Sequence, residues 1–371
     1  MNWNKQTSLA QQGTRDKEIW IREENGKTAK FPVEIYMGKK TNLLKLKKNI
    51  VESIQKQVSY YQDSRTKLYN QSEMENVNCC MVCGTDSNDT SDATTIYGAN
   101  YVQCNHCSHV YVIKRPAPKA IHNFYLNDIT YAATYTDRSA AESRLNSIAV
   151  PWANWMIDVF EQQHGRKPKS VLDVGSGAGH FVEACRRMGI QADGVELSES
   201  SREFSQEIWG IRLDGRDFTE VVEDYKGYDI VTFWGLLEHT PNPGQILKAA
   251  FDVVSASDAG MVISKLPRWN SLSSAIQKLV PETVIRHLDP MGHIMAFSDA
   301  SAAELYTRNG FAPVAAWYYG MDIYETFMQI GHKTSSFDPL IQTGDLQVEL
   351  QQAIDEVRFA DGLTLVGVPI V

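Results

Sequence analysis

Four cysteines in two close pairs are the clearest chemical feature of the sequence. Cys80 and Cys83 form one C-x2-C pair, and Cys104 and Cys107 form a second pair twenty residues later. Each pair can grip a metal from a tight turn, and four thiolates complete the tetrahedral shell of a zinc ion. Because four thiolates leave no open position for water, we expect a structural zinc site. Cys79 is an alternative to Cys80, although its x3 spacing is less usual.

A second candidate site is a glycine-rich turn. An apolar strand that contains Asp173 runs into Gly175, Gly177 and Gly179, after which a helix is expected. The glycines allow a ligand to approach the backbone closely, and the helix N-terminus presents free N–H groups. Glu196, at the end of the next expected strand, can accept both hydroxyls of a ribose. The turn reads G-x-G-x-G, whereas nicotinamide cofactors favour G-x-G-x-x-G.

An acid and a histidine stand side by side after the apolar run that ends at Trp234. His239 is the best candidate for a general base, since an unperturbed histidine titrates near ~6.5. Glu238 could orient it, bind a hydroxyl or ligate a divalent metal. A second polar cluster contains His293, which is a candidate for lining a substrate pocket, with an ordinary loop histidine as the alternative.

The elements that must position these residues alternate along the chain. Helices are expected near 180–189, 199–209 and 243–255, between apolar strands over 170–174, 191–196, 229–234 and 260–265. This alternation is typical of a doubly wound α/β fold, whose parallel sheet is covered on both faces. The carboxyl ends of such strands meet at one edge of the sheet, where ligands bind. After a helix over 299–309, two further strands are expected near 312–319 and 325–330.

Residues 170–330 resemble the class I methyltransferases that use S-adenosylmethionine. The similarity rests on the glycine turn, on Glu196, and on the stretches Asp217-Phe218 and 237–243. In that family the glycine turn holds the amino-acid end of the cofactor, and the acid at the end of the second strand holds the ribose. The resemblance implies a Rossmann-like sheet and enzymatic transfer of a methyl group.

The resemblance also assigns the rest of the cofactor site. Asp217 would accept a hydrogen bond from the adenine amino group, and Phe218 would cover the adenine ring. Trp234 could lie near the sulfonium, because an aromatic face favours a cation; packing in the core is its alternative role. Asp173, the three glycines and Glu196 complete the expected site.

A four-cysteine lobe before the catalytic domain resembles a methyltransferase group that includes the C-methyltransferases of deoxysugar nucleotides and relatives from polysaccharide biosynthesis. In those enzymes the Glu-His pair belongs to the active site and a Tyr precedes it. This sequence has Leu236 there, so O-methylation stays open beside C-methylation. In the ubiquinone O-methyltransferase-like branch a similar acidic pair supports a metal, so the resemblance also allows Mg²⁺. We expect methyl transfer to a small-molecule or carbohydrate acceptor, a nucleotide sugar or a glycan, with His239 as the base.

Three other functions are considered. An RNA methyltransferase could grip RNA with its zinc lobe, but the net charge of -9 and the absence of an Asn/Asp-Pro-Pro-aromatic signature argue against nucleic acid. A zinc-ribbon scaffold with a vestigial cofactor fold is the non-enzymatic alternative, which the intact glycine turn disfavours. A hydride-transfer enzyme would bind NAD instead of S-adenosylmethionine. Oligomeric state cannot be read from the sequence.

Composition sets broad limits on the class of protein. The 371 residues are 43% hydrophobic and 22% charged, which are ordinary values for a globular protein. No apolar run reaches the length of a membrane span, and the first residues lack the layout of a signal peptide, so we expect a cytoplasmic protein. Residues 1–78 carry a net charge of +5 and the remainder -14. This basic segment could meet an anionic partner or be a solvated surface.

Five segments are expected along the chain. They are an N-terminal extension of a hairpin plus a helix (1–77), a zinc-binding lobe (78–117), a helical connector (118–165), the methyltransferase domain (166–334), and a C-terminal helix and strand (335–371). In the connector, Tyr131 and Tyr135 could close over the cofactor. The overall prediction is an α/β protein with a small zinc-ribbon lobe.

Overall fold

The computed structural model describes residues 1–7, 15–39, 54–71, 73–117, 119–121, 124, 138–284 and 286–370. Tyr131 and Tyr135 lie outside these residues, as do residues 40–53 of the N-terminal extension in which a helix was expected. None of the helices described combines the length and the apolar character that crossing a membrane requires.

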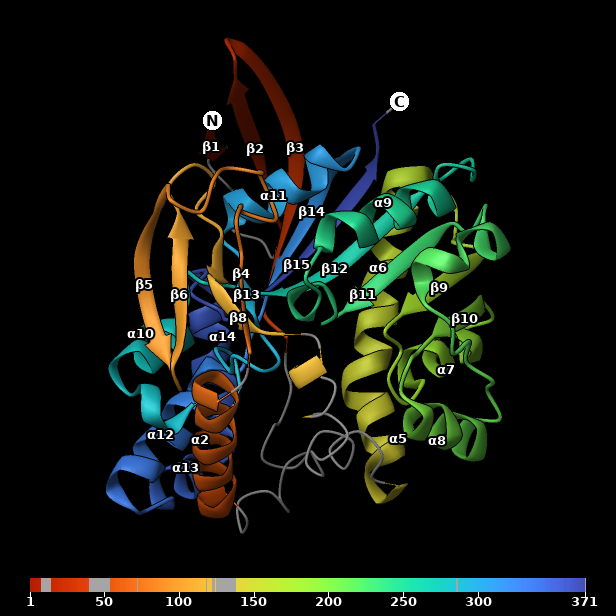
Figure 1. The fold of residues 1–371 in the computed structure, drawn as a ribbon. Helices are drawn as coiled ribbons and strands as arrows, with labels where there is room; N and C mark the ends of the chain where they lie inside the picture. The colour runs from red at the N-terminus through yellow and green to blue at the C-terminus, as the bar shows by residue number, and fades with distance from the viewer. Residues whose placement is uncertain are drawn as a thin grey trace.

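A nine-stranded mixed sheet runs through the protein (Figure 1). Its strand order is β1-β2-β3-β14-β15-β12-β11-β9-β10. Within it, β9 to β12 are parallel neighbours, as the alternating apolar runs predicted. The strands are β1 (Asn2–Thr7), β2 (Arg15–Glu24), β3 (Lys27–Met37), β9 (Ser170–Val174), β10 (Gln191–Val195), β11 (Ile230–Trp234), β12 (Met261–Pro267), β14 (Phe311–Tyr318) and β15 (Gly362–Pro369).

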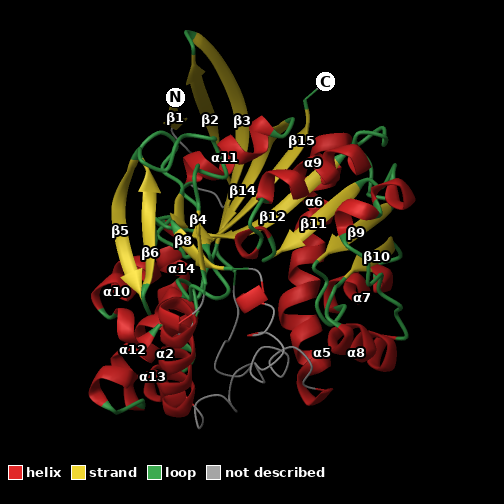
Figure 2. Cartoon of the chain, in the orientation of Figure 1, coloured by secondary structure: helices red, strands yellow, loops and turns green. Residues whose placement is uncertain are grey.

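Helices cover the sheet and bury its apolar side chains in two separate clusters (Figure 2). Met156 and Val182 belong to one cluster, and Leu247 and Ala302 belong to the other. The Rossmann-like doubly wound architecture is therefore confirmed. The helices concerned are α5 (Ala141–Arg144), α6 (Val150–His164), α7 (His180–Arg187), α8 (Glu199–Trp209), α9 (Pro243–Val254) and α11 (Asp299–Arg308).

Strands from residues 2–37 and from residues 362–369 complete the sheet. The hairpin of β2 and β3 pairs with β14 through β3, and β15 inserts antiparallel between β12 and β14. An apolar strand needs backbone partners on both sides when it is buried on both faces. β15 is such a strand, since its first six residues are all buried.

The strand expected over 325–330 is a helix, α12 (Asp322–Thr334). Tyr324 and Met328 are both buried, and their spacing of four residues places them on one helical face. A short apolar run cannot be assigned to a strand or a helix by periodicity alone. Beside it lie α2 (Ile54–Gln71), α10 (Leu272–Leu279), α13 (Asp338–Thr343) and α14 (Leu346–Glu356).

The cysteine lobe is a second, four-stranded sheet of order β13-β7-β6-β5. Of these four strands, only β13 comes from the part of the chain after residue 170, and its pairing with β7 joins the lobe to that part. The lobe also contains a two-stranded ribbon of β4 and β8. The strands are β4 (Met74–Asn76), β5 (Thr90–Ile96), β6 (Ala99–Cys104), β7 (Val110–Val112), β8 (Lys114–Pro116) and β13 (Met295–Ala296).

Tyr101 of β6 fastens the lobe to the loop that precedes β13. Its hydroxyl lies 2.8 Å from the carbonyl oxygen of His293 and 3.1 Å from that of Leu288. The hydroxyl of Tyr111, on the adjacent strand β7 but on the other face of this sheet, is also buried and has no hydrogen-bond partner among the residues that the structure describes. The two tyrosines thus form a natural pair of test and control.

We predict that Tyr101→Phe lowers the free energy of unfolding by about 1–3 kcal/mol, because it leaves buried carbonyl oxygens without a donor. Tyr111→Phe should change it by less than about 0.5 kcal/mol. Urea unfolding of both variants measures the difference. Equal effects would show that the Tyr101 hydroxyl does not hold the loop.

Candidate active site

The glycine turn lies at the carboxyl end of β9. Gly175, Gly177 and Gly179 all have positive φ angles, which glycine adopts without steric cost. A Cβ atom at Gly179 would lie 2.4 Å from Oγ of Ser205 on α8, so this position also needs glycine for close packing. The backbone N–H groups of Gly175 and Ser176 both donate to the carbonyl of Val195, at the end of β10.

The carboxylate of Glu196 lies against the glycine turn. Its Oε2 accepts a hydrogen bond of 2.8 Å from the N–H of Gly177, and its Oε1 accepts one of 2.7 Å from the N–H of Ser198. Asp173 lies deeper in the sheet and accepts a hydrogen bond of 2.7 Å from the hydroxyl of Thr232. Burial raises the pKa of Asp173 to about 7.

The other residues expected around the cofactor have structural partners as well. Asp217 is exposed and accepts hydrogen bonds from the backbone and hydroxyl of Thr219. Phe218 is buried and meets Phe233 edge-on, with 6.2 Å between ring centres. Trp234 is half-buried. Asp217 and Phe218 lie in a short helical turn between β10 and β11, and the role of all three residues toward a cofactor remains a prediction.

Glu238, His239 and His293 come together although 54 positions separate the two histidines. Oε1 of Glu238 lies 3.9 Å from Nε2 of His239 and 3.8 Å from Nε2 of His293. The Glu238 side chain is 4% exposed, whereas those of His239 and His293 are 20% and 18% exposed. The carboxyl is therefore enclosed, and the imidazoles lie between it and solvent.

Burial sets the protonation states of this cluster. It raises the pKa of Glu238 to about 7 and lowers that of His239 to about 4. Burial and the neighbouring histidines hold the pKa of His293 well below its usual range. At neutral pH both imidazoles are uncharged, and the carboxyl titrates where it can take up a proton.

One hydrogen bond fixes the tautomer of His293. Its Nδ1 donates to the carbonyl of His287 over 2.7 Å, so its Nε2 carries the lone pair and faces Glu238. Each of Glu238, His239 and His293 offers one atom that could bind a metal ion, and these three atoms lie within 4.8 Å of one another. Mg²⁺ prefers oxygen ligands and octahedral geometry, so two nitrogens and one carboxylate do not fit the Mg²⁺ ion that the sequence resemblance allowed.

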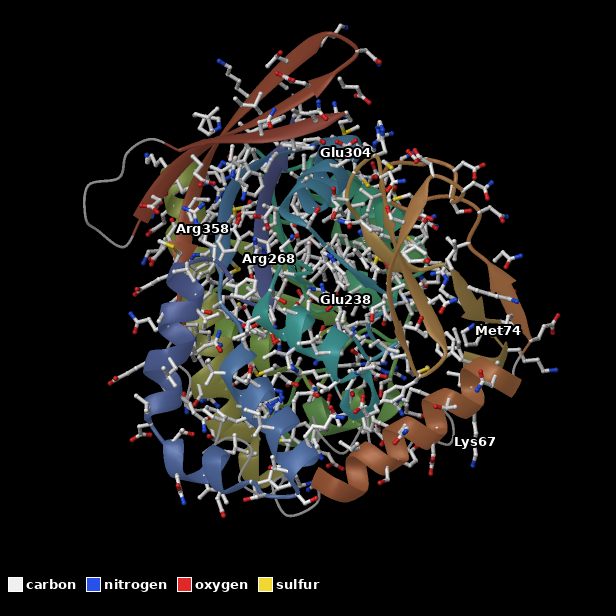
Figure 3. The ribbon with its side chains drawn as sticks, turned by 90° about the vertical axis from the view of Figure 1, so that its left-hand side faces the viewer. Lys67, Met74, Glu238, Arg268, Glu304 and Arg358 are labelled. Carbon is white, nitrogen blue, oxygen red and sulfur yellow. The ribbon has the colours of Figure 1, made fainter. Side chains whose placement is uncertain are left out.

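Side chains of α2, near the N-terminus of the chain, hold the loop that carries His293. Arg65 of α2 forms two hydrogen bonds of 3.0 and 3.1 Å with the Asp289 carboxylate, and both residues are buried. The hydroxyl of Tyr69 donates to the carbonyl of Pro290. Figure 3 shows α2 along the edge of the molecule, with Glu238 farther inside. The segment before the lobe therefore supports the catalytic part of the chain.

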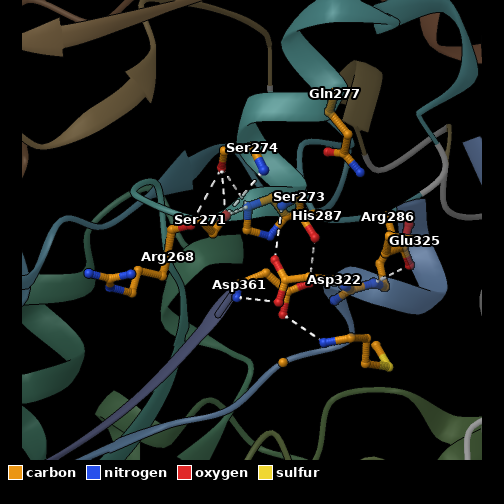
Figure 4. Close-up of polar contacts among 12 residues, drawn as sticks. Arg268, Ser271, Ser273, Ser274, Gln277, Arg286, His287, Asp322, Glu325 and Asp361 are labelled. Atoms are coloured by element: carbon orange, nitrogen blue, oxygen red, sulfur yellow. Dashed lines mark hydrogen bonds and ion pairs between the residues drawn. The ribbon is translucent and has the colours of Figure 1, made fainter. Parts of the chain in front are cut away.

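A polar network around Arg286 and His287 also contacts the loop that carries His293 (Figure 4). Arg286 forms ion pairs with Glu325 and Asp361. The hydroxyl of Ser274 lies 2.8 Å from Nε2 of His287. Because each of these groups has a polar partner, the network orders the loop without leaving those charges unpaired.

The four predicted cysteines form one buried cluster. Sγ of Cys80 lies 3.6 Å from Sγ of Cys107, and the same distance separates Cys83 from Cys104. Zinc–sulfur bonds of about 2.3 Å in a tetrahedron put the sulfurs about 3.8 Å apart, so the cluster fits such an ion. Cys79 is exposed and lies outside the cluster, which decides between Cys79 and Cys80.

Sequence reasoning missed Lys39, Lys265 and Trp152. Lys265 lies near the carboxyl end of β12, beside Trp234 in register. Lys265 could have been noticed in the sequence, because it is a charged residue in an otherwise apolar strand. Lys39 gave no such signal, because it reaches the site only through the pairing of β3 with β14.

Comparisons with known proteins agree with this architecture. Residues 152–316 match the family model described as "Methyltransferase domain". The chain is 37% identical over 97 residues to a ubiquinone biosynthesis O-methyltransferase of Coxiella burnetii, which covers 25% of this chain and 42% of that protein. It is 30% identical over 129 residues to the protein of the same name from Pseudomonas paraeruginosa, which covers 33% and 54%.

The chain thus spans about half the length of the curated relatives it matches. Among solved structures, a SAM dependent methyltransferase from Archaeoglobus fulgidus is 16% identical, with a TM-score of 0.39. That likeness covers 61% of this chain and 96% of the other.

The raised pKa of Glu238 should make the free energy of unfolding depend on pH. Between about pH 4.5 and 7 its carboxyl is protonated in the folded protein and ionised in the unfolded chain, so stability falls as the pH rises through this range. Glu238→Gln removes this loss. Relative to the natural protein, the variant should gain roughly 1–3 kcal/mol between pH 4.5 and 8. Urea unfolding at both pH values measures the gain, and parallel pH profiles would contradict the assignment.

Proposed function

We propose that this protein transfers a methyl group from S-adenosylmethionine to a small-molecule acceptor. The observation that carries the proposal is the pairing of Glu196 with the N–H of Gly177 in the glycine turn of a methyltransferase domain. The N-terminus of α7, directly after the turn, offers backbone N–H groups to the amino-acid end of the cofactor, and Glu196 offers carboxylate oxygens to its ribose. NAD is disfavoured by the G-x-G-x-G spacing.

For the remaining cofactor contacts we retain Asp217, Phe218 and Trp234 as candidates, with reduced roles for Phe218 and Trp234. Asp217 is exposed and accessible to an adenine amino group, and Phe218 would contribute only a buried edge. Trp152 stacks on Trp234 with 4.4 Å between ring centres, so one face of Trp234 is already covered. Only the rest of that indole could meet the sulfonium.

The Glu238–His239 pair would accept the proton that the acceptor loses. Methyl transfer is a displacement at an activated sulfonium, so the enzyme must align the nucleophile and remove a proton. His239 was the sequence candidate for the base, but burial makes it a weak one. Glu238, with a pKa of about 7, matches the task better, and His239 and His293 would orient the acceptor.

Oxygen is the acceptor atom that the comparisons favour. The matched relatives are named as O-methyltransferases of ubiquinone biosynthesis. They give no support to the nucleotide sugar or glycan acceptor, nor to a role in polysaccharide biosynthesis, that the sequence resemblance implied. The RNA alternative gains nothing from them either.

The four-cysteine cluster would hold a zinc ion with a structural role. Cys80, Cys83, Cys104 and Cys107 would be its ligands, and no open position would remain for water or substrate. The lobe that the ion orders is the one that pairs with β13 and contacts His293. Zinc would therefore act on the active site only through the fold.

We predict that Glu196→Gln weakens binding of S-adenosylhomocysteine at least tenfold, because one carboxylate oxygen toward the ribose is lost. Glu203→Gln, at an exposed position on α8, is the matched control and should bind normally. Calorimetry measures both, with NAD as a second ligand. Unchanged affinity in Glu196→Gln, or binding of NAD by the natural protein, would contradict the assignment.

Metal analysis of the purified protein should find one zinc per chain. Cys83→Ser should lose the metal and unfold the lobe, since zinc binding to such sites contributes on the order of 10 kcal/mol to folding. Cys79→Ser should keep the full content of zinc. A metal-free natural protein that folds normally would overturn the zinc assignment.

A further inference from the structure

Two lysine side chains meet over the same pair of aromatic rings. Nζ of Lys39 lies 4.9 Å from the ring centre of Trp152 and 5.6 Å from that of Tyr319. Nζ of Lys265 lies 5.9 and 5.8 Å from the same two centres. The lysines come from β12 and from the end of β3, which are far apart in the sequence. The fold therefore gathers two positive charges at one place.

The described residues give these two charges no ion-pair partner. Throughout the described part of the chain, no carboxylate forms an ion pair with either ammonium group. Glu238 and Asp361 act on Lys265 only from a distance, and Arg286 opposes them. Burial and the charge of Lys265 lower the pKa of Lys39 to about 7. Two desolvated like charges are costly in a protein without a ligand.

A third donor lies beside the lysines. Trp234 is paired in register with Lys265 and stacks on Trp152. Its Nε1–H is buried and finds no hydrogen-bond acceptor within the residues described. The place thus offers two ammonium groups and an indole N–H. Such a set recognises an anion.

We propose that Lys39 and Lys265 bind an anionic group of the methyl acceptor, either a carboxylate or a phosphate. This inference rests on the proposed function, because only a methyltransferase has such an acceptor. Lys265 lies on β12, and β11, which leads to Glu238, separates it from the glycine turn after β9. An anion held there is on the acceptor side of the sheet edge, where it would turn the acceptor's hydroxyl toward Glu238.

The carboxylate of the cofactor is the other anion that could reach the lysines, and the experiment separates the two. Calorimetry would measure the binding of benzoate and of sulfate, at constant ionic strength, to protein saturated with S-adenosylhomocysteine. The same titrations without S-adenosylhomocysteine test the anion site even if the cofactor assignment fails. Lys265→Met is the variant, and Lys248→Met, exposed on α9, is the matched control.

We expect saturable binding of at least one anion to the natural protein, weakened at least tenfold in Lys265→Met and unchanged in Lys248→Met. Binding of benzoate alone would identify a carboxylate, and binding of sulfate alone a phosphate-like group. The affinity for S-adenosylhomocysteine should stay within twofold in all variants. No binding of either anion, or equal binding in Lys265→Met, would overturn the proposal. A tenfold loss of S-adenosylhomocysteine affinity would assign the lysines to the cofactor instead.

Thermal unfolding provides the second measurement. Methionine has a similar volume to lysine and no charge, so Lys265→Met should not lower the melting temperature if the lysine serves a ligand. A fall of more than about 5 °C would show that Lys265 is part of a structural ion pair, and this result would also overturn the proposal.

Discussion

The parallel pairing of β9, β10, β11 and β12 determines where the chemistry of this protein can occur. In-register hydrogen bonding carries the carboxyl ends of these strands to the same edge of the sheet. The glycine turn follows β9, Glu196 follows β10, and Glu238 follows β11, while Lys265 lies on β12 itself. A shift of one residue in any pairing would turn that strand's side chains to the other face. The candidate cofactor site and the candidate acceptor site are therefore neighbours because of backbone geometry.

The second half of the site depends on a different constraint. His293 lies in a loop whose carbonyl groups accept hydrogen bonds from the hydroxyls of Tyr69 and Tyr101, and whose Asp289 is bound by Arg65. These partners come from α2 and from the cysteine lobe. A loop placed in this way keeps the imidazole of His293 in one orientation before any ligand arrives. The lobe thus supports the loop that carries His293 in the candidate active site.

Much of the central sheet could be predicted because its signals are local. The strand at Ser170–Val174 is bounded as expected, and the apolar runs and glycines announce the turn that follows. The closeness of Glu196 to the glycine turn could also be predicted, because both follow the carboxyl ends of neighbouring parallel strands. The cysteine spacing predicted the cluster because two tight turns bring the thiols together.

The rest depends on contacts that no local pattern encodes. β15 reads as an apolar tail, yet it fills the middle of the sheet, where only the tertiary pairing of β12 and β14 decides its place. The helix α12 was misread because its apolar run is short. Lys39 looks like a surface residue after a strand and reaches the acceptor side only through that strand's partner. The charges of Lys39 and Lys265 suggest a binding role only once the fold shows that no carboxylate of the described residues forms an ion pair with them.

A crystal structure of the protein with S-adenosylhomocysteine tests the central claim most directly. The account predicts the ribose hydroxyls on the carboxylate of Glu196, the amino-acid end of the ligand over the turn at Gly175–Gly179, and the sulfur directed toward Glu238 and His239. A ligand bound away from the glycine turn, or with its sulfur directed away from Glu238, would contradict it.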